Sequence, residues 1–269
     1  MEGRVLVIAG SDSGGGAGIQ ADIKTITALG SFAATAITAL TAQNTLGIQA
    51  VEPVEPLFVE KQIDSVLDDI GADAIKLGML ASHTTVELVA RRLETKAQSI
   101  PIVLDPVILA SDGSPLLNDR GIDALRERLL PQCALITPNL DEAARLVGGE
   151  VDSVDSMQRA ADLLLLQGAA AVLITGGHLE GDEVTDLLRT ADGEQLLIES
   201  PRVHTRSTHG TGCTLSSAVA AGIARGLTLS SAVTIAHEYV QRALRLAPGY
   251  GKGRGPLNHA HPFITEAEA

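Results

Sequence analysis

The chain has 269 residues, of which 45% are hydrophobic and only 2% aromatic, so it can bury a full core built from Ala, Val, Leu and Ile. Its formal net charge of −13 argues against a nucleic-acid surface or an acidic membrane face, although local loops can still bind an anionic substrate. The chain contains two cysteines far apart in sequence, Cys133 and Cys213, which do not suggest a disulfide framework.

The N-terminal segment turns into glycines after one short apolar run, and it lacks the longer apolar region and cleavage site of a signal peptide. No segment reaches the roughly 18–20 unbroken apolar residues of a membrane span. These features predict a soluble, cytoplasmic protein that contacts neither a membrane nor nucleic acid.

Strand-like and helix-like runs alternate along the chain. The predicted strands are short and continuously apolar, as is typical of strands buried on both faces of a parallel sheet; they cover 4–10, 32–41, 73–79, 100–107, 134–139 and 170–177. Helical patterns cover 20–29, 56–70, 84–95, 121–130 and 156–168. A hairpin turning at Asp192–Gly193 follows over 183–203, and then two helices over 211–225 and 229–246. The alternation predicts one domain over residues 1–269, with an open, mainly parallel sheet flanked by helices on both faces.

A glycine-rich loop, residues 10–22, follows the first predicted strand and leads into a helix. In such sheets ligands bind beyond the carboxyl ends of the strands, and glycines let the backbone approach a ligand closely. The loop is not a phosphate loop of the Walker type, and it does not match the dinucleotide fingerprint cleanly. A plain βα loop is the alternative interpretation.

Two acidic positions follow later strands. Asp105 comes directly after the strand near 100–104, and Asn139 and Glu142 are three residues apart at a helix start. The second pair fits a variant of the capping box, and Asp105 alone fits a turn cap. The functional alternative is that Asp105 and Glu142 hold Mg²⁺ for a nucleotide, because hard cations bind carboxylate oxygens.

Two further loops carry polar groups. Thr175, Gly176 and His178 end a strand; alone they form a turn, and near phosphates the Thr175 hydroxyl and the glycine amides could be donors. Residues 210–213, Gly-Thr-Gly-Cys, lead into a helix and would present backbone N–H groups to an anion. Cys213 there is predicted to have a lowered pKa and to be partly thiolate, and the alternative is a small residue packed at a turn.

Together these motifs resemble the ribokinase-like superfamily and, more closely, the bacterial hydroxymethylpyrimidine/phosphomethylpyrimidine kinases. The resemblance runs in order from residue 4 to about 261. It is carried by AGSDSGGGAGIQADIKT (9–25), TALTAQNT (38–45), KLGML (76–80), VLDPV (103–107), TPNLDEA (137–143), GGH (176–178), THGTGCTLSSA (208–218) and GPLNH (255–259).

The resemblance implies a homodimeric phosphotransferase of thiamine biosynthesis. With ATP and Mg²⁺ it would phosphorylate the hydroxymethyl group of 4-amino-5-hydroxymethyl-2-methylpyrimidine, and then phosphorylate the monophosphate to the diphosphate. The Gln43 amide would pair with the amino group and ring nitrogen, since one amide offers an acceptor beside a donor. Asp22 would lie near the hydroxymethyl group, and the remaining implied substrate contacts are the Ala17–Gly18 backbone, Met79 and Val107.

On the phosphate side the resemblance implies that Asp105 and Glu142 serve the metal and the phosphates. Asn139, Thr175 and Gly176 would contact the nucleotide. Gly210, Thr211 and Gly212 would form an anion hole, with Cys213 in the position of the catalytic base.

Two positions depart from the family pattern. Thr175 and His237 stand where the family has lysines near the nucleotide, which leaves open the cation that neutralises the phosphates. Lys76 is the remaining motif lysine, and its place inside a strand suits a structural role as well as a catalytic one. The loops 10–18 and 110–118 are candidates for mobile lids.

Two other functions compete with the pyrimidine kinase. A pyridoxine/pyridoxal kinase would use a similar ring with a hydroxymethyl group, and a thiol at position 213 could add to the aldehyde of pyridoxal. Gln43 favours the aminopyrimidine. A ligand-binding protein without turnover is the other alternative; the two missing lysines favour it, and Asp105, Glu142 and the Gly-Thr-Gly-Cys loop argue against it.

Overall fold

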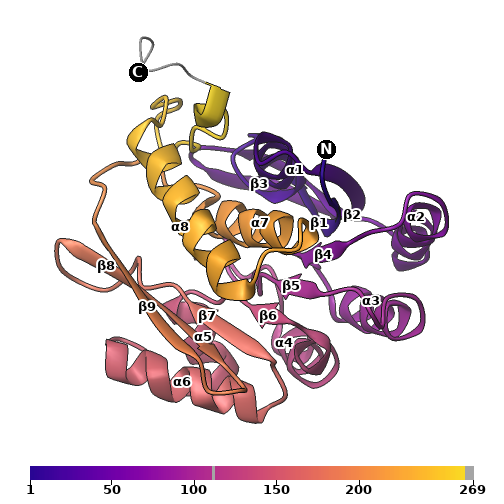
Figure 1. Cartoon of the computed structure of the whole chain (residues 1–269). Helices are drawn as coiled ribbons and strands as arrows, with labels where there is room; N and C mark the ends of the chain where they lie inside the picture. The colour runs from indigo at the N-terminus through magenta and orange to yellow at the C-terminus, as the bar shows by residue number, and fades with distance from the viewer. Residues whose placement is uncertain (111–112, 264–269) are drawn as a thin grey trace.

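The computed structural model describes residues 1–110 and 113–263, and its centre is a nine-stranded sheet in the order β3-β2-β1-β4-β5-β6-β7-β8-β9 (Figure 1). The strand pairs from β2 to β7 are parallel, whereas β3, β8 and β9 join by antiparallel pairing. The strands are β1 (Arg4–Asp12), β2 (Phe32–Asn44), β3 (Gly47–Pro53), β4 (Ala74–Leu77), β5 (Ile102–Leu104), β6 (Leu135–Ile136), β7 (Ala171–Ile174), β8 (Glu183–Thr190) and β9 (Gln195–Pro201).

Helices cover both faces of the sheet (Figure 1). In β1 the side chains alternate, so that Val5 and Val7 belong to one core and Leu6 and Ile8 to the other. The first core includes α1 (Gly18–Ala28), α7 (Thr211–Ala224) and α8 (Leu229–Arg245). The second includes α2 (Pro56–Asp69), α3 (His83–Lys96), α4 (Asp119–Ala124), α5 (Leu140–Val147) and α6 (Val154–Leu166). The predicted doubly wound α/β fold is confirmed.

Some predicted elements need correction. β3 was not predicted, because most of its residues are exposed and an exposed edge strand shows no buried apolar run. The predicted strand 100–107 ends at Leu104, since Asp105 begins a turn and Pro106 lacks an N–H group. The predicted strand 134–139 shortens to Leu135–Ile136. The helix predicted over 121–130 is α4 followed by a π turn, Leu125–Leu129.

The strand order places the glycine loop at a reversal of connectivity. β1 lies between β2 and β4, so the chain moves to one side after β1 and returns to the other side with β4. Such a reversal leaves a crevice at the carboxyl ends of the two strands. Gly10, near the end of β1, and Met79, just after β4, meet there, because a Cβ on Gly10 would lie 3.1 Å from the Met79 sulfur.

Among residues 1–110 and 113–263, no helix is both long and apolar enough to cross a lipid bilayer.

Candidate active site

A buried lysine joins two carboxylates below the strand ends. Lys76 of β4 is fully buried, and its Nζ lies 3.0 Å from Asp22 Oδ1 of α1 and 3.7 Å from Asp105 Oδ2. The Ser217 hydroxyl donates to Asp22 at 2.7 Å, and the Ser216 hydroxyl donates to Asp105 at 3.2 Å. Burial raises the pKa of both carboxyls, and the Lys76 charge opposes that rise. The side chain of Lys76 therefore binds the two predicted acids together from inside the core.

The predicted anion loop, residues 210–213, lies over Asp105. Gly210 has φ +86°, and a Cβ there would lie 1.8 Å from the Gly16 carbonyl oxygen, so only glycine allows this contact between the loops. A Cβ on Gly212 would lie 3.8 Å from Asp105 Oδ1. Thr211 begins α7, and its hydroxyl donates to the Thr208 carbonyl at 2.8 Å. The positive end of α7 thus faces the buried acids.

Cys213 lies in the first turn of α7 and is half-buried. Burial raises the pKa of its thiol, and the carboxylates of Asp105 and Asp22 raise it further. The Lys76 charge and the Gly18 N–H act in the opposite direction without cancelling this. The predicted lowering of the Cys213 pKa was therefore wrong, because burial and the charges of the two acids outweigh the Lys76 charge and the Gly18 N–H.

Asn139 and Glu142 form the predicted capping box of α5. The Asn139 side chain accepts from the Glu142 N–H at 3.0 Å, and Glu142 Oε2 accepts from the Asn139 N–H at 3.0 Å. Burial, followed by the charge of Asp105, raises the pKa of Glu142 to about 8. The capping role does not exclude the metal role, since the carboxyl of Glu142 is still close enough to Asp105 for their charges to interact.

The substrate residues implied by the resemblance surround the glycine loop. The Ala17 N–H donates to Asp12 at 2.9 Å, and Gly18 has φ +55° in a position where a Cβ would lie 2.4 Å from the Gly10 carbonyl oxygen. Gln43 is anchored to this loop by its backbone, which exchanges two hydrogen bonds with the Ser13 hydroxyl at 2.8 and 2.9 Å. The loop is therefore fixed to β2, where Gln43 lies.

Met79 and Val107, the apolar side chains expected to form a wall beside the substrate ring, lie beside these groups. The carbonyl of Met79 accepts from the Thr38 hydroxyl at 2.6 Å, and the N–H of Val107 donates to the Asp105 carbonyl at 2.8 Å.

Of the two predicted lids, the loop 10–18 is held by hydrogen bonds to Asp12. Residues 111–112 of the other lie outside the described residues, so that lid stays a prediction.

The predicted nucleotide residues follow β6 and β7. Thr175 pairs with Asn139 in an isolated bridge, and its N–H donates to the Pro138 carbonyl at 3.0 Å. The Gly176 N–H donates to Asp186 Oδ1 at 2.9 Å, and Asp186 Oδ2 lies 2.9 Å from His237 Nδ1. His178 is exposed, as expected for a turn residue. Asp186 thus connects the Gly176 loop to α8.

A pocket of about 300 Å³ opens beside His237, between β9 and α8. Three buried polar atoms on its lining residues have no hydrogen-bond partner among the described parts of the chain: His237 Nε2, Gln241 Oε1 and Ser200 Oγ. Unpartnered buried polar atoms are rare in folded proteins. These three atoms belong to residues that line one pocket, so water or a ligand there would be their available partner.

Three polar residues of the site were missed in the sequence: Asp12, Asp186 and His209. Asp12 and His209 belong to the quoted motifs GSDSGGGAGIQAD and THGTGC, but their contact spans 197 positions. Asp186 lies in β8, inside a hairpin whose pattern predicts only strands. Its one signal is an acidic residue among apolar neighbours.

Comparisons with known proteins identify the family of this chain. The phosphomethylpyrimidine kinase family profile matches residues 12–258. A hydroxymethylpyrimidine/phosphomethylpyrimidine kinase of Streptomyces coelicolor is 48% identical over 255 residues, covering 95% of this chain and 93% of the relative. A thiamine biosynthesis bifunctional protein of Geobacter sulfurreducens is 45% identical over 96% of this chain, which spans only 52% of that relative.

Among solved structures, an ADP complex of Bacillus subtilis pyridoxal kinase aligns with a TM-score of 0.88 and 36% identity, covering 97% of this chain and 98% of that one. The resemblance and the ribokinase-like fold inferred from the motifs are both confirmed. With the profile matching most of its length and relatives close to half identical, the chain belongs to the phosphomethylpyrimidine kinase family, whose members are phosphotransferases.

Proposed function

We propose that this chain transfers the γ-phosphoryl group of ATP to the hydroxymethyl group of 4-amino-5-hydroxymethyl-2-methylpyrimidine, and then phosphorylates the monophosphate, as a step of thiamine biosynthesis. The observation that carries the proposal is the meeting of the α7 N-terminus with Asp105 and Lys76 at the strand ends. Fixed N–H groups at a helix start stabilise the charge that develops on a transferred phosphoryl group.

The residues divide the work between binding and proton movement. The Gln43 amide binds the aminopyrimidine edge, and Met79 and Val107 contact the ring. The N–H groups of residues 210–213 hold the transferred group. Because the Cys213 thiol is protonated at rest, it relays a proton: its Sγ accepts the hydroxyl proton as its own proton passes to Asp105. Positioning matters more than base strength in this reaction, because the transition state is loose.

Asp105 and Glu142 suit Mg²⁺, which is commonly held by one or two carboxylates together with phosphate and water. Burial and the charge of Asp105 raise the pKa of Glu142, and a cation bound by both carboxylates would relieve this repulsion. Within the described ranges no set of three or more His, Cys, Asp or Glu side chains could hold a metal, so the phosphates would complete this site. When bound, Mg²⁺ would neutralise phosphate charge.

The nucleotide extends from this point across Asn139, Thr175 and Gly176. Beyond them the Asp186–His237 contact leads into the pocket between β9 and α8, whose unpartnered polar atoms suit the polar edge of a nucleobase. His237 takes the place of a family lysine here. The ring supplies a hydrogen-bonding nitrogen in place of a fixed charge.

An assay of ADP release tests the function. The protein is given ATP, Mg²⁺ and, in separate reactions, the aminopyrimidine alcohol, its monophosphate, pyridoxine and pyridoxal. We expect turnover with the first two. Turnover with pyridoxine or pyridoxal alone would support the pyridoxal kinase function, for which the structural likeness to the Bacillus subtilis enzyme is the specific argument. Binding of these compounds without turnover would support a protein that has lost catalysis.

The role of Cys213 needs its own variants. For a relay thiol, Cys213→Ala lowers kcat by about 10²-fold, on the usual scale of proton-transfer catalysis, and Cys213→Asp recovers part of the rate. Near-normal turnover by the alanine variant would show that the thiol only fills space.

The predicted homodimer and cytoplasmic location belong to the same proposal. A group of exposed apolar side chains on β2, β3, the turn between them and the start of α2 supports a partner at that sheet edge: Leu40, Leu46, Val51, Leu57 and Phe58. Light scattering during size-exclusion chromatography would measure the mass, and Leu46→Glu together with Phe58→Glu should convert a dimer to monomers. A monomeric wild-type protein would contradict the dimer.

A further inference from the structure

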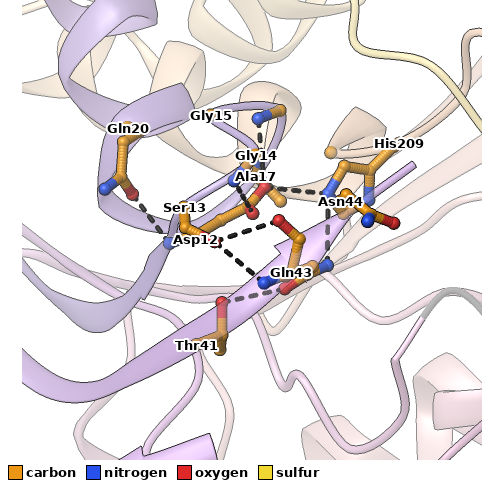
Figure 2. A network of polar contacts seen from close by, with 12 residues as sticks. Asp12, Ser13, Gly14, Gly15, Ala17, Gln20, Thr41, Gln43, Asn44 and His209 are labelled. Atoms are coloured by element: carbon orange, nitrogen blue, oxygen red, sulfur yellow. Dashed lines mark hydrogen bonds and ion pairs between the residues drawn. The ribbon is translucent and has the colours of Figure 1, made fainter. Parts of the chain in front are cut away.

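The side chain of Gln43 lies within a polar network whose other members are Asp12, Thr41 and His209. Figure 2 shows Gln43 and His209 pointing toward one another beside the glycine loop, with Asp12 at the base of that loop. Gln43 Nε2 lies 3.3 Å from His209 Nε2, and Gln43 Oε1 lies 3.1 Å from the Thr41 hydroxyl. An amide can exchange its oxygen and nitrogen by a half-turn, so the neighbours decide which atom lies where.

Asp12 determines the proton on His209. Its carboxylate accepts from three backbone N–H groups, those of Gly14, Gly16 and Ala17, at 2.8, 3.0 and 2.9 Å. Burial favours protonation of Asp12, but the hydrogen bonds from His209 and the loop outweigh it and hold the Asp12 pKa below its ordinary value. The ionised carboxylate lies 2.9 Å from His209 Nε2, so that nitrogen must carry a proton and donate it to Asp12.

A protonated His209 Nε2 cannot accept a bond from the Gln43 amide nitrogen. The same nitrogen can donate to the amide oxygen, so the His209 contact requires the Gln43 carbonyl to face His209. In that arrangement the His209 N–H is shared between Asp12 and Gln43.

Thr41 leads independently to the same orientation. Its hydroxyl carries a single proton and lies 3.0 Å from the Ser11 carbonyl, which can only accept. Having donated to Ser11, the hydroxyl must accept from Gln43, and this requires the amide nitrogen to face Thr41. Two neighbours on opposite sides of the amide therefore favour one orientation, with the oxygen toward His209 and the nitrogen toward Thr41.

We propose that Asp12 and His209 are positioning residues that fix the Gln43 amide in this orientation and thereby select a 4-amino over a 4-oxo pyrimidine. The proposal rests on the proposed function. The free lone pair of the amide oxygen receives the amino group on the His209 side, and the free N–H donates to the ring nitrogen on the Thr41 side. The hydroxymethyl group is on the ring carbon next to the amino-bearing carbon, so it extends toward residues 210–213, which follow His209 in the chain. An oxo analogue presents the reverse pattern and would force two N–H groups together.

The test compares kcat/KM for the amino alcohol and for its 4-oxo analogue. For the wild type we expect a preference for the amino compound of at least about 100-fold, because two hydrogen bonds are mismatched in the analogue. In His209→Ala the amide can turn, so this preference should fall at least tenfold, with KM for the amino compound rising more than kcat falls. His204→Ala, a change of an exposed histidine on the same segment, should keep the wild-type preference.

A second measurement does not depend on an activity assay. In protein labelled with ¹⁵N-histidine, the ring nitrogens of His209, assigned by their loss in His209→Gln, should show a protonated Nε2 in the free enzyme. An unprotonated Nε2, or an amino preference within twofold of wild type in His209→Ala, would overturn the proposal. Failure of the wild type to phosphorylate either pyrimidine would instead contradict the proposed function, and the histidine spectrum would still decide the arrangement of the network.

Discussion

The proposed substrate half and the proposed nucleotide half of the site are built differently. Around the glycine loop, Asp12, Gln43 and His209 are linked into one hydrogen-bonded network (Figure 2). Between β9 and α8, by contrast, His237 Nε2 and Gln241 Oε1 are buried and have no hydrogen-bond partner within residues 1–110 and 113–263. A network whose members are already paired needs little reorganisation when a ligand binds, whereas unpartnered atoms gain hydrogen bonds from a ligand or from water. In the proposed function the ring therefore binds a preformed surface, and the nucleotide completes its own pocket.

The largest expected effect comes from breaking the contact between the two loops of the substrate half. In Gly210→Ala the new methyl group would collide with the Gly16 carbonyl, so residues 210–213 must shift. We expect kcat to fall by about 10²–10³-fold, the scale of losing one anion-hole donor, in a steady-state assay.

Gly226→Ala is the matched control for that change. Gly226 has a similar φ of +83°, but a Cβ there would meet no atom within 4 Å. It should cost only about 1–2 kcal/mol of stability from the left-handed backbone and leave kcat unchanged. Equal kcat losses in the two variants would show that backbone strain, and not the loop contact, is responsible.

Removing the buried cation is the next largest change. Lys76→Met leaves Asp22 and Asp105 facing each other without a positive charge. We expect the free energy of unfolding in urea to fall by about 3–5 kcal/mol, as when one partner of a buried ion pair is removed. Lys96→Met, which removes a surface pair with Asp68, should cost less than about 1 kcal/mol. Equal costs would mean that the buried lysine is not needed to stabilise the acids.

His259, which contacts the Thr214 hydroxyl of α7, should make the free energy of unfolding sensitive to acid. Burial, with smaller contributions from Lys24 and His261, lowers the pKa of His259 to about 4 from an ordinary 6.5. The contribution of His259 to stability is complete above pH 6.5, because its side chain is then neutral in both the folded and the unfolded chain. As pH falls toward 4 the unfolded chain binds the proton first, so stability falls, by up to about 3 kcal/mol.

Urea unfolding at pH 7 and pH 5 would measure this effect against His259→Gln, which keeps a partner for the Thr214 hydroxyl, 3.0 Å away in the wild type. The glutamine variant should lose less stability between the two pH values than the wild type. An identical pH dependence would show that His259 takes a proton as easily in the folded chain as in the unfolded one.

The smallest effect should appear in the nucleotide half, where a substitution is expected to raise the free energy of unfolding and not to lower it. Gln241→Met removes an unpartnered buried oxygen and should raise the free energy of unfolding by about 1 kcal/mol. The same change should raise KM for ATP and leave KM for the pyrimidine unaltered. Lower stability in this variant would mean that Gln241 already has a partner, and the comparison between the halves would fail.

The sequence was most informative where burial is continuous. The runs around Leu6, Ile75 and Leu173 predict buried strands, and each lies in the sheet. The exposed strand β3 gave no such signal. The role of Lys76 stayed open, because its partners come from distant elements and only the packed fold shows that one side chain reaches both acids.

Contacts across the chain explain the other errors and omissions. The Cys213 pKa was predicted from the helix start alone, because the neighbouring sequence does not show that Asp22 and Asp105 lie close to Cys213 in the fold. Asp12 and His209 were both quoted within motifs, yet their pairing joins the first strand to the loop before α7. The spacing of apolar residues predicts helices and strands, whereas the pKa of a side chain depends on charges that only folding brings together.

The close approach of Gly16 and Gly210 has a consequence for how this enzyme can change. In the proposed function His209 acts in ring recognition and Gly210 in phosphoryl transfer, although they are neighbours in the chain, and Gly210 packs directly on the glycine loop. A mutation that reshapes the ring site would also move the group that holds the phosphate. New substrates should therefore arise through side chains of the wall, such as Met79 and Val107, while the lengths of the two loops stay fixed.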